Sequence, residues 1–188
     1  MRRIALTLLL GSLVVPALAN DEAKLLEEAR SIAQTLPPKM LNVIQSEIKK
    51  GGPEQALDAC NQLSPKMAAL ATEETGWAIR RVSMKNRNPK AVPDEWEKGV
   101  LAEFEQRLSA GEPPMAMDKG MIVADGDKKF YRYMRPLMTQ KLCMECHGPA
   151  DGISPNVKAR LNELYPDDRA TGFTEGKMRG ALTIKKPL

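Results

Sequence analysis

Apolar residues recur every three or four positions through the first part of the chain, from about residue 25 to residue 71. This spacing places them along one side of a helix, so it predicts helices rather than strands. We expect one helix over 25–36 that stops at Pro37-Pro38, because proline cannot donate the next helical hydrogen bond. A second helix over 38–50 is expected to end at Gly51.

Two shorter helices are expected next. Pro53 suits the first position of a helix, and Leu57 and Cys60 then fall on one side of it. Cys60 should therefore face inward near the end of a short helix. Ser64 and Pro65 have the residue types of an N-cap and a first helical position, so a fourth helix is expected after them.

Later in the chain the pattern favours strands. Three segments combine β-branched or aromatic residues with alternating positions or turn residues: 77–84, 121–134 and 180–186. The middle segment contains Asp125-Gly126-Asp127, which predicts a hairpin turn. Helices are also predicted at 96–108 and after Ser154. The whole pattern predicts an α+β fold in which helices precede a small antiparallel sheet.

The N-terminus has a different pattern. A basic start precedes a short apolar run, and Ala17 and Ala19 have the small side chains of a cleavage site. Residues 1–19 are therefore predicted to be a secretory signal peptide, with an uncleaved membrane anchor as the alternative. We expect a periplasmic protein whose residues 20–188 form a single domain without a membrane span.

The net charge of the chain excludes only a few kinds of binding partner. The chain has 28 Lys and Arg against 24 Asp and Glu, and the two signs are interspersed. This balance predicts no nucleic-acid partner. An acidic redox partner and an ordinary solvated surface are both compatible with the small basic excess.

The residues that can carry chemistry lie in the string LCMECHGP, which holds Cys143, Cys146 and His147, the only histidine. Two cysteines at this spacing can bond to the two vinyl groups of one haem, and the following histidine can ligate the iron. We expect one covalent haem c, with thioethers from both cysteines and His147 as the proximal iron ligand. A redox-active dithiol or part of a zinc site are alternatives, but further zinc ligands and a thioredoxin-like pattern are not evident.

The second axial ligand of such an iron cannot be another histidine. Methionine is one candidate, an open position is another, and Cys60 is a third, because an exported chain rarely keeps an odd cysteine. For Cys60 the alternative is a buried thiol without a ligand role. The methionine candidates are Met67, Met115, Met117, Met121, Met134, Met138 and Met178.

Four stretches carry a resemblance to a known family: GGPEQALDACNQLSPKMA, GWAIRRVSMKNRNPKAVPDEWE, KFYRYMRPLMTQKLCMECHG and LNELYPDDRATGFTEGKMRGALTIKKPL. Together they resemble the PAS-like c-type haem-binding domain family, the Tll-like haem domains. The resemblance implies a PAS-like antiparallel sheet flanked by helices, which occurs alone in the periplasm or ahead of signalling domains. It also implies that Cys60 is the second axial ligand of the haem iron.

Neighbouring charged and aromatic residues are further candidates. Three arginines could neutralise haem propionates or form ordinary surface ion pairs: Arg80, Arg81 and Arg87. Three aromatic residues could line a haem, although core packing is the simpler interpretation: Trp77, Tyr131 and Tyr133.

Two functions fit these expectations. The first is an electron carrier or redox store that exchanges electrons with an unidentified protein and has no substrate chemistry. The alternative is a haem-based redox or gas sensor that acts through a signalling partner. An enzyme is not expected, because the chain has no second histidine to move protons.

Overall fold

The computed structural model describes residues 17–188, and side chains from Asp21 onward. Residues 1–16 of the predicted signal peptide lie outside this range. Among residues 17–188, no helix has the length and apolar character needed to cross a membrane.

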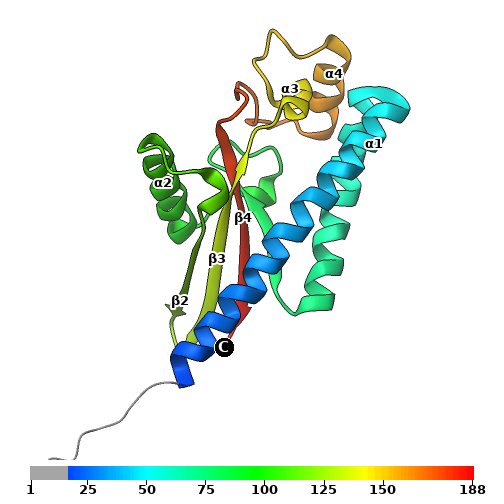
Figure 1. Cartoon of the computed structure of the whole chain (residues 1–188). Helices are drawn as coiled ribbons and strands as arrows, with labels where there is room; N and C mark the ends of the chain where they lie inside the picture. Colours follow the sequence, from blue (N-terminus) through cyan, green and yellow to red (C-terminus); the bar gives the residue numbers. More distant parts are fainter. Residues whose placement is uncertain (1–16) are drawn as a thin grey trace, which may run out of the picture.

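Helix α1 spans Ala17–Thr75 and folds back on itself at Gly51-Gly52, where the backbone leaves the helical conformation. Gly52 has φ 81° and ψ −179°, a combination that is essentially restricted to glycine. The two arms, residues 17–50 and 53–75, form a hairpin whose turn lies beside α3 and α4 (Figure 1). The predicted break at the glycines and the helix start at Pro53 are confirmed.

Two helix ends predicted inside these arms are wrong. Pro37-Pro38 lies within the first arm, and Ser64-Pro65 lies within the second. The apolar side of the first arm continues beyond the prolines to Met40, which is buried. Packing along a long apolar side outweighs the hydrogen bonds that the prolines remove.

The sheet has four antiparallel strands in the order β1-β4-β3-β2. Their bounds are Ala78–Val82 (β1), Lys119–Asp125 (β2), Lys128–Met138 (β3) and Met178–Pro187 (β4). The predicted turn at Asp125-Gly126-Asp127 does join β2 to β3. β3 runs farther than predicted, through Pro136 to Met138, and carries the chain toward the cysteine motif.

The two faces of the sheet have separate cores. Helix α1 covers one face, and α2, Glu95–Ser109, covers the other (Figure 1). The buried residues on the α1 face are Ala29, Ala33, Trp77, Ile79, Tyr131, Tyr133, Leu182 and Ile184. Those on the α2 face are Val82, Val100, Leu101, Phe104, Met117, Met134, Met178 and Ala181. The predicted α+β fold, an antiparallel sheet flanked by helices, is confirmed.

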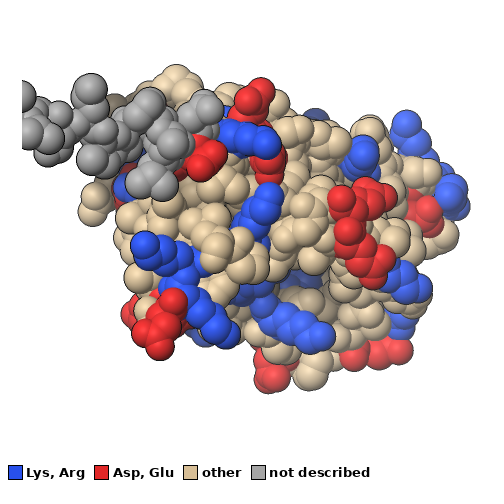
Figure 2. Space-filling view, turned by 90° about the horizontal axis from the view of Figure 1, so that it is seen from below, with Lys and Arg blue, Asp and Glu red and all other residues tan. Residues whose placement is uncertain are grey.

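The remaining helices gather at one end of the sheet, beyond the last residues of β3 (Figure 1). They are α3, Met144–His147, preceded by a 3₁₀ turn at Lys141–Cys143, and α4, Pro155–Leu164. Ser154 caps α4, as predicted, by accepting the backbone N–H of Val157. Two other 3₁₀ turns lie at Pro89–Ala91 and Pro114–Ala116. Figure 2 views the opposite end, which carries the C-terminus, and shows basic and acidic side chains interspersed there.

Candidate functional site

The cysteine motif forms a compact helical turn at the end of the sheet. Cys143 closes the 3₁₀ turn, and Cys146 and His147 follow in α3. Both cysteines are half-buried free thiols. Burial raises the pKa of Cys146 to about 12, although the Arg87 charge acts in the opposite direction. Because Cys143 ends the 3₁₀ turn and Cys146 lies in the α3 turn that follows directly, both thiols lie on one helical turn, as attachment of a single flat group requires.

His147 is held by the loop that follows α4. Its Nδ1 lies 2.7 Å from the carbonyl oxygen of Ala170, and its own carbonyl accepts the Phe173 N–H at 3.0 Å. Because Ala170 offers only an acceptor, Nδ1 carries the proton and donates it, which leaves Nε2 free to bind a metal. Burial, followed by the charges of Arg87 and Arg179, holds the pKa of His147 well below its usual value. The imidazole is therefore neutral at neutral pH, as a ligand must be.

Arg87 fastens this loop to the motif. Its guanidinium donates to the carbonyl oxygens of Cys146 and Ala170 and pairs with Asp168 at 3.0 Å. The Arg87 and Asp168 side chains are each 10% exposed, so this is a largely buried pair whose charges balance. Arg87 thus positions both the backbone of Cys146 and the acceptor of His147.

Cys60 approaches the same place from the second arm of α1. Leu57, one turn earlier, packs in a cluster with residues of α4 that also touches Cys146. Burial raises the pKa of the Cys60 thiol, while Arg81, Arg179 and Arg87 lower it. The same three arginines act on His147. The structure therefore brings Cys60 and the cysteine motif, which are far apart in the sequence, around one group of arginines.

Arg179 is a site residue that the sequence analysis missed. Leu137 pairs with Gly180 and Met138 pairs with Met178, so Arg179 is an extra residue in β4, a β-bulge. A glycine inside a strand pattern is the sequence signal that could have indicated this bulge.

Arg80, by contrast, does not belong to the site. Its guanidinium pairs at 2.5 Å with the buried carboxylate of Glu97 on the α2 face. Arg81 is the next residue along β1 and donates instead to Ser64 on α1. Alternation of side chains along a strand sends these neighbours to opposite faces, so of the two possibilities for Arg80 the structure shows the ion pair.

The aromatic candidates are core residues. Trp77 and Tyr131 pack edge-to-face with ring centroids 6.0 Å apart, and Tyr133 is fully buried beside them. Trp77 donates its indole N–H to Glu28, and Tyr133 donates its hydroxyl to Asp118. The core-packing interpretation of these three residues is therefore the correct one.

A family-level sequence comparison matches residues 19–187, almost the whole chain. The chain belongs to the Tll0287-like family. No curated protein matches it in sequence. A solved structure, that of the cyanobacterial heme-protein Tll0287, is similar with a TM-score of 0.61 and 23% sequence identity. The similarity covers 93% of this chain and 97% of that one, so this member of the Tll0287-like family shares its fold along nearly the full length.

Most methionine candidates of this Tll0287-like chain either pack on the α2 face or are exposed. Four of them belong to the core on the α2 face: Met117, Met134, Met138 and Met178. Met115 and Met121 are exposed, with 80% and 39% of their surface accessible. Met67 is the one candidate on the same arm of α1 as Cys60, and it is half-buried.

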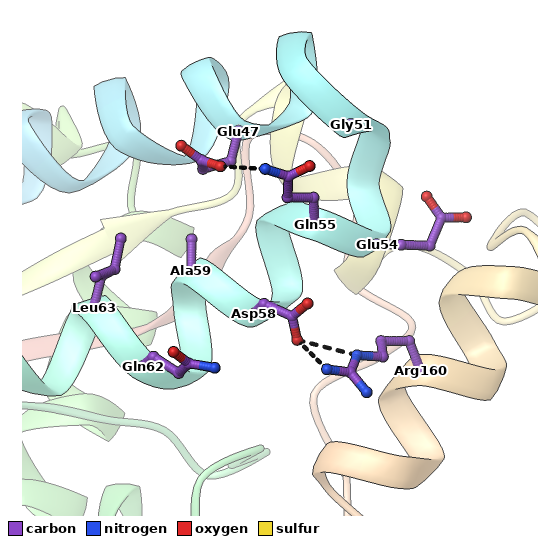
Figure 3. Close-up of a pocket in the computed structure, with 9 residues that line it drawn as sticks. All are labelled: Glu47, Gly51, Glu54, Gln55, Asp58, Ala59, Gln62, Leu63 and Arg160. Atoms are coloured by element: carbon purple, nitrogen blue, oxygen red, sulfur yellow. Dashed lines mark hydrogen bonds and ion pairs between the residues drawn. The ribbon is translucent and has the colours of Figure 1, made fainter.

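A separate hollow of about 610 Å³ lies near the turn of α1 (Figure 3). Its lining residues are Glu47, Gly51, Glu54, Gln55, Asp58, Ala59, Gln62, Leu63 and Arg160. At 100° per residue, Asp58 and Gln62 lie on the opposite side of the helix from Cys60. Arg160 of α4 pairs with Asp58 across the hollow. The candidate site residues do not line it.

Proposed function

We propose that this protein is an exported, periplasmic haem protein that carries one haem c and serves in electron transfer or as a redox store. Cys143 and Cys146 would hold the haem through thioethers, and His147 and Cys60 would ligate the iron. The observation that carries this proposal is the placement of Cys60 and the cysteine motif around the same arginines. Similarity to a structure described as a heme-protein supports it.

The residues at the site fit such a group. Cys60, Cys143, Cys146 and His147 include the ligand types of a zinc site, yet among the described residues no three His, Cys, Asp or Glu side chains are arranged to hold a bare ion. In the part of the chain that the structure describes, the buried Nε atom of Arg179 has no hydrogen-bond partner, and no carboxylate is paired with Arg81. Unpaired cationic donors beside neutral thiols favour a ligand that brings carboxylates. Haem brings two.

The fold prepares both proposed iron ligands, His147 and Cys60, for binding. When bound, haem supplies an iron that takes up or releases one electron. His147 presents Nε2 because Nδ1 is engaged by Ala170. The arginine charges favour the thiolate form of Cys60, which offsets part of the cost of burying it. A thiolate donor stabilises ferric iron, so we expect a low reduction potential.

We expect the purified exported protein to contain one covalent haem per chain in a pyridine haemochrome assay, and no stoichiometric zinc. Cys60→Ala should convert the ferric spectrum from a low-spin thiolate type and raise the potential, because the sulfur donor is lost. Met67→Leu is the matched control on the same arm and should leave both unchanged. A spectrum that responds to Met67→Leu but not to Cys60→Ala would make methionine the ligand, and a haem-free protein would refute the proposal.

A haem-based redox or gas sensor is the second candidate. Its support is that Cys60 comes from α1 whereas His147 comes from α3, so loss of the thiolate bond would free one arm of α1. Such a sensor would need a separate signalling partner. Carbon monoxide binding at low concentration, together with a change in the exposure of α1, would favour this candidate over the carrier.

We propose that the protein does not bind nucleic acid and does not catalyse a reaction on a substrate. The charges of both signs are interspersed over the face in Figure 2. The only histidine of the chain is assigned to the iron, so none remains to transfer protons to a substrate.

A further inference from the structure

The bulge in β4 decides where Arg179 points. Met178 and Ala181 both lie in the core on the α2 face, although regular alternation would put residues three apart on opposite faces. The extra residue resets the alternation and leaves Arg179 on the α1 side, where its charge acts on Cys60 and Arg81. Ser83 holds the bulge by donating its hydroxyl to the Arg179 carbonyl at 2.7 Å.

Gly180 makes the bulge possible. Its φ of 149° is one that other residues rarely adopt, and a Cβ atom there would lie 2.2 Å from the Val82 carbonyl oxygen. A strained, glycine-dependent irregularity beside a cluster of ligand-type residues is typical of a functional site.

Arg81 and Arg179 carry charges that nothing in the described chain neutralises. Arg81 donates to the hydroxyl of Ser64 at 2.6 Å, and the ionisable groups that act on it are Arg179, Cys60 and Tyr165. None of these is a carboxylate. The Nε of Arg179 is buried without a partner. Two like charges in a partly buried place destabilise the fold unless an anion joins them.

Other arginines in the protein show the contrast. Arg87 has Asp168 at 3.0 Å, and Arg132 has Asp94 at 2.7 Å and Glu97 at 3.1 Å. Buried guanidinium groups are thus paired with carboxylates elsewhere. Arg81 and Arg179 depart from this pattern, and they do so on the same side of the sheet.

We propose that Arg81 and Arg179 bind the two propionates of the haem, with Arg87 acting only to position the loop around His147. This inference rests on the proposed function, and it names the residues that bind the propionates of the proposed haem. A planar guanidinium matches a carboxylate through paired hydrogen bonds, so two unpaired arginines correspond to two propionates. The pair fixes the orientation of the haem between α1 and α3.

The arginines also set part of the reduction potential. Their positive charges oppose the additional positive charge of ferric iron, so removing either one stabilises the ferric state. Arg81→Gln and Arg179→Gln should each lower the potential, and the double variant should lower it further. Arg179→Lys keeps the charge without the planar fork, so it should restore most of the potential.

The experiment uses the haem-loaded protein and measures both the midpoint potential and the resonance Raman bands of propionate bending. Lys128→Gln is the control, because Lys128 is exposed at the β2–β3 turn and its loss removes one positive charge at the other end of the sheet. We expect both readouts to change in the two glutamine variants and neither to change in the control. Arginine variants that load haem and match the control in both readouts would overturn the inference. A wild-type protein without haem would instead overturn the proposed function.

Discussion

Asp118 shows how one side chain can join three elements. Its carboxylate accepts from Arg30 on α1 at 2.6 Å and from the Tyr133 hydroxyl on β3 at 3.1 Å, and it directly precedes β2. Burial disfavours the ionised form, but the hydrogen bonds and charge of Arg30, with the bond from Tyr133, hold the pKa below its usual value. The carboxylate therefore stabilises the folded state only while it is ionised.

This gives a pH-dependent prediction. Because the folded pKa of Asp118 is lowered, its contribution is complete above about pH 4, the value for an unfolded chain, and is lost as the pH falls through the folded pKa. Asp118→Asn should lower the free energy of unfolding by about 1 kcal/mol at pH 7, a modest figure because Arg30 is half exposed. Urea titrations from pH 7 to pH 3 should show the difference from wild type narrowing toward zero.

Asp125→Asn is the control for that experiment. Asp125 is 74% exposed and lies 3.9 Å from Lys185, so its replacement should have little effect at any pH. A difference between Asp118→Asn and wild type that stays constant down to pH 3 would contradict the assignment.

At the scale of elements, the bend in α1 determines what the second arm can reach. Gly51-Gly52 reverses the helix, so the start of the returning arm, which carries Cys60, lies beside α3 and α4 (Figure 1). Prolines within the arms do not bend the chain in this way, because both arms continue through them. The position of the thiol therefore depends on two glycines rather than on Pro37, Pro38 and Pro65.

Replacement of two glycines by alanine should have opposite effects on stability. Gly52→Ala places a side chain at φ 81° and should lower the free energy of unfolding by about 1–3 kcal/mol. Gly99→Ala, inside α2 with nothing within 4 Å of the new Cβ, should raise it by about 0.5–1 kcal/mol. Chemical denaturation of both variants in parallel measures the two effects. If both variants changed the free energy of unfolding by the same amount in the same direction, the positive φ of Gly52 would not be what requires glycine at the bend.

At the scale of the whole molecule, the proposed haem would join α1 and α3 to the paired strands β1 and β4. Its ligands come from α1 and α3, and its arginines come from β1 and β4. A group that binds only the folded state stabilises it, and the protection is largest at the segments it joins. Haem loading should therefore stabilise mainly the end of the protein that contains α3.

We expect the haem-loaded protein to melt at least about 5 °C above the haem-free chain made without attachment machinery. Hydrogen exchange should slow in residues 53–75 and 141–148, and should be unchanged in the β2–β3 hairpin at the opposite end (Figure 1). Equal exchange at both ends would contradict a haem held between α1 and α3.

The sequence alone was sufficient to predict features that depend only on residues close together along the chain. Asp125-Gly126-Asp127 specifies a turn and Ser154 specifies a cap, and both are observed, whereas the close spacing of Cys143, Cys146 and His147 predicts an attachment motif that a haem assay has to test. The family resemblance also followed from the sequence, and the comparison confirms it.

The folded chain was needed wherever distant residues compete or cooperate. Arg80 and Arg81 are alike in sequence, but they lie on opposite faces of the sheet, one beside Glu97 and one beside Cys60. Arg179 joins the site only because a bulge shifts the alternation of β4. Pro37-Pro38 fails to end its helix because packing along the whole arm outweighs a local loss of hydrogen bonds. Each of these outcomes depends on long-range packing and charge pairing, whose energies are absent from any local window of sequence.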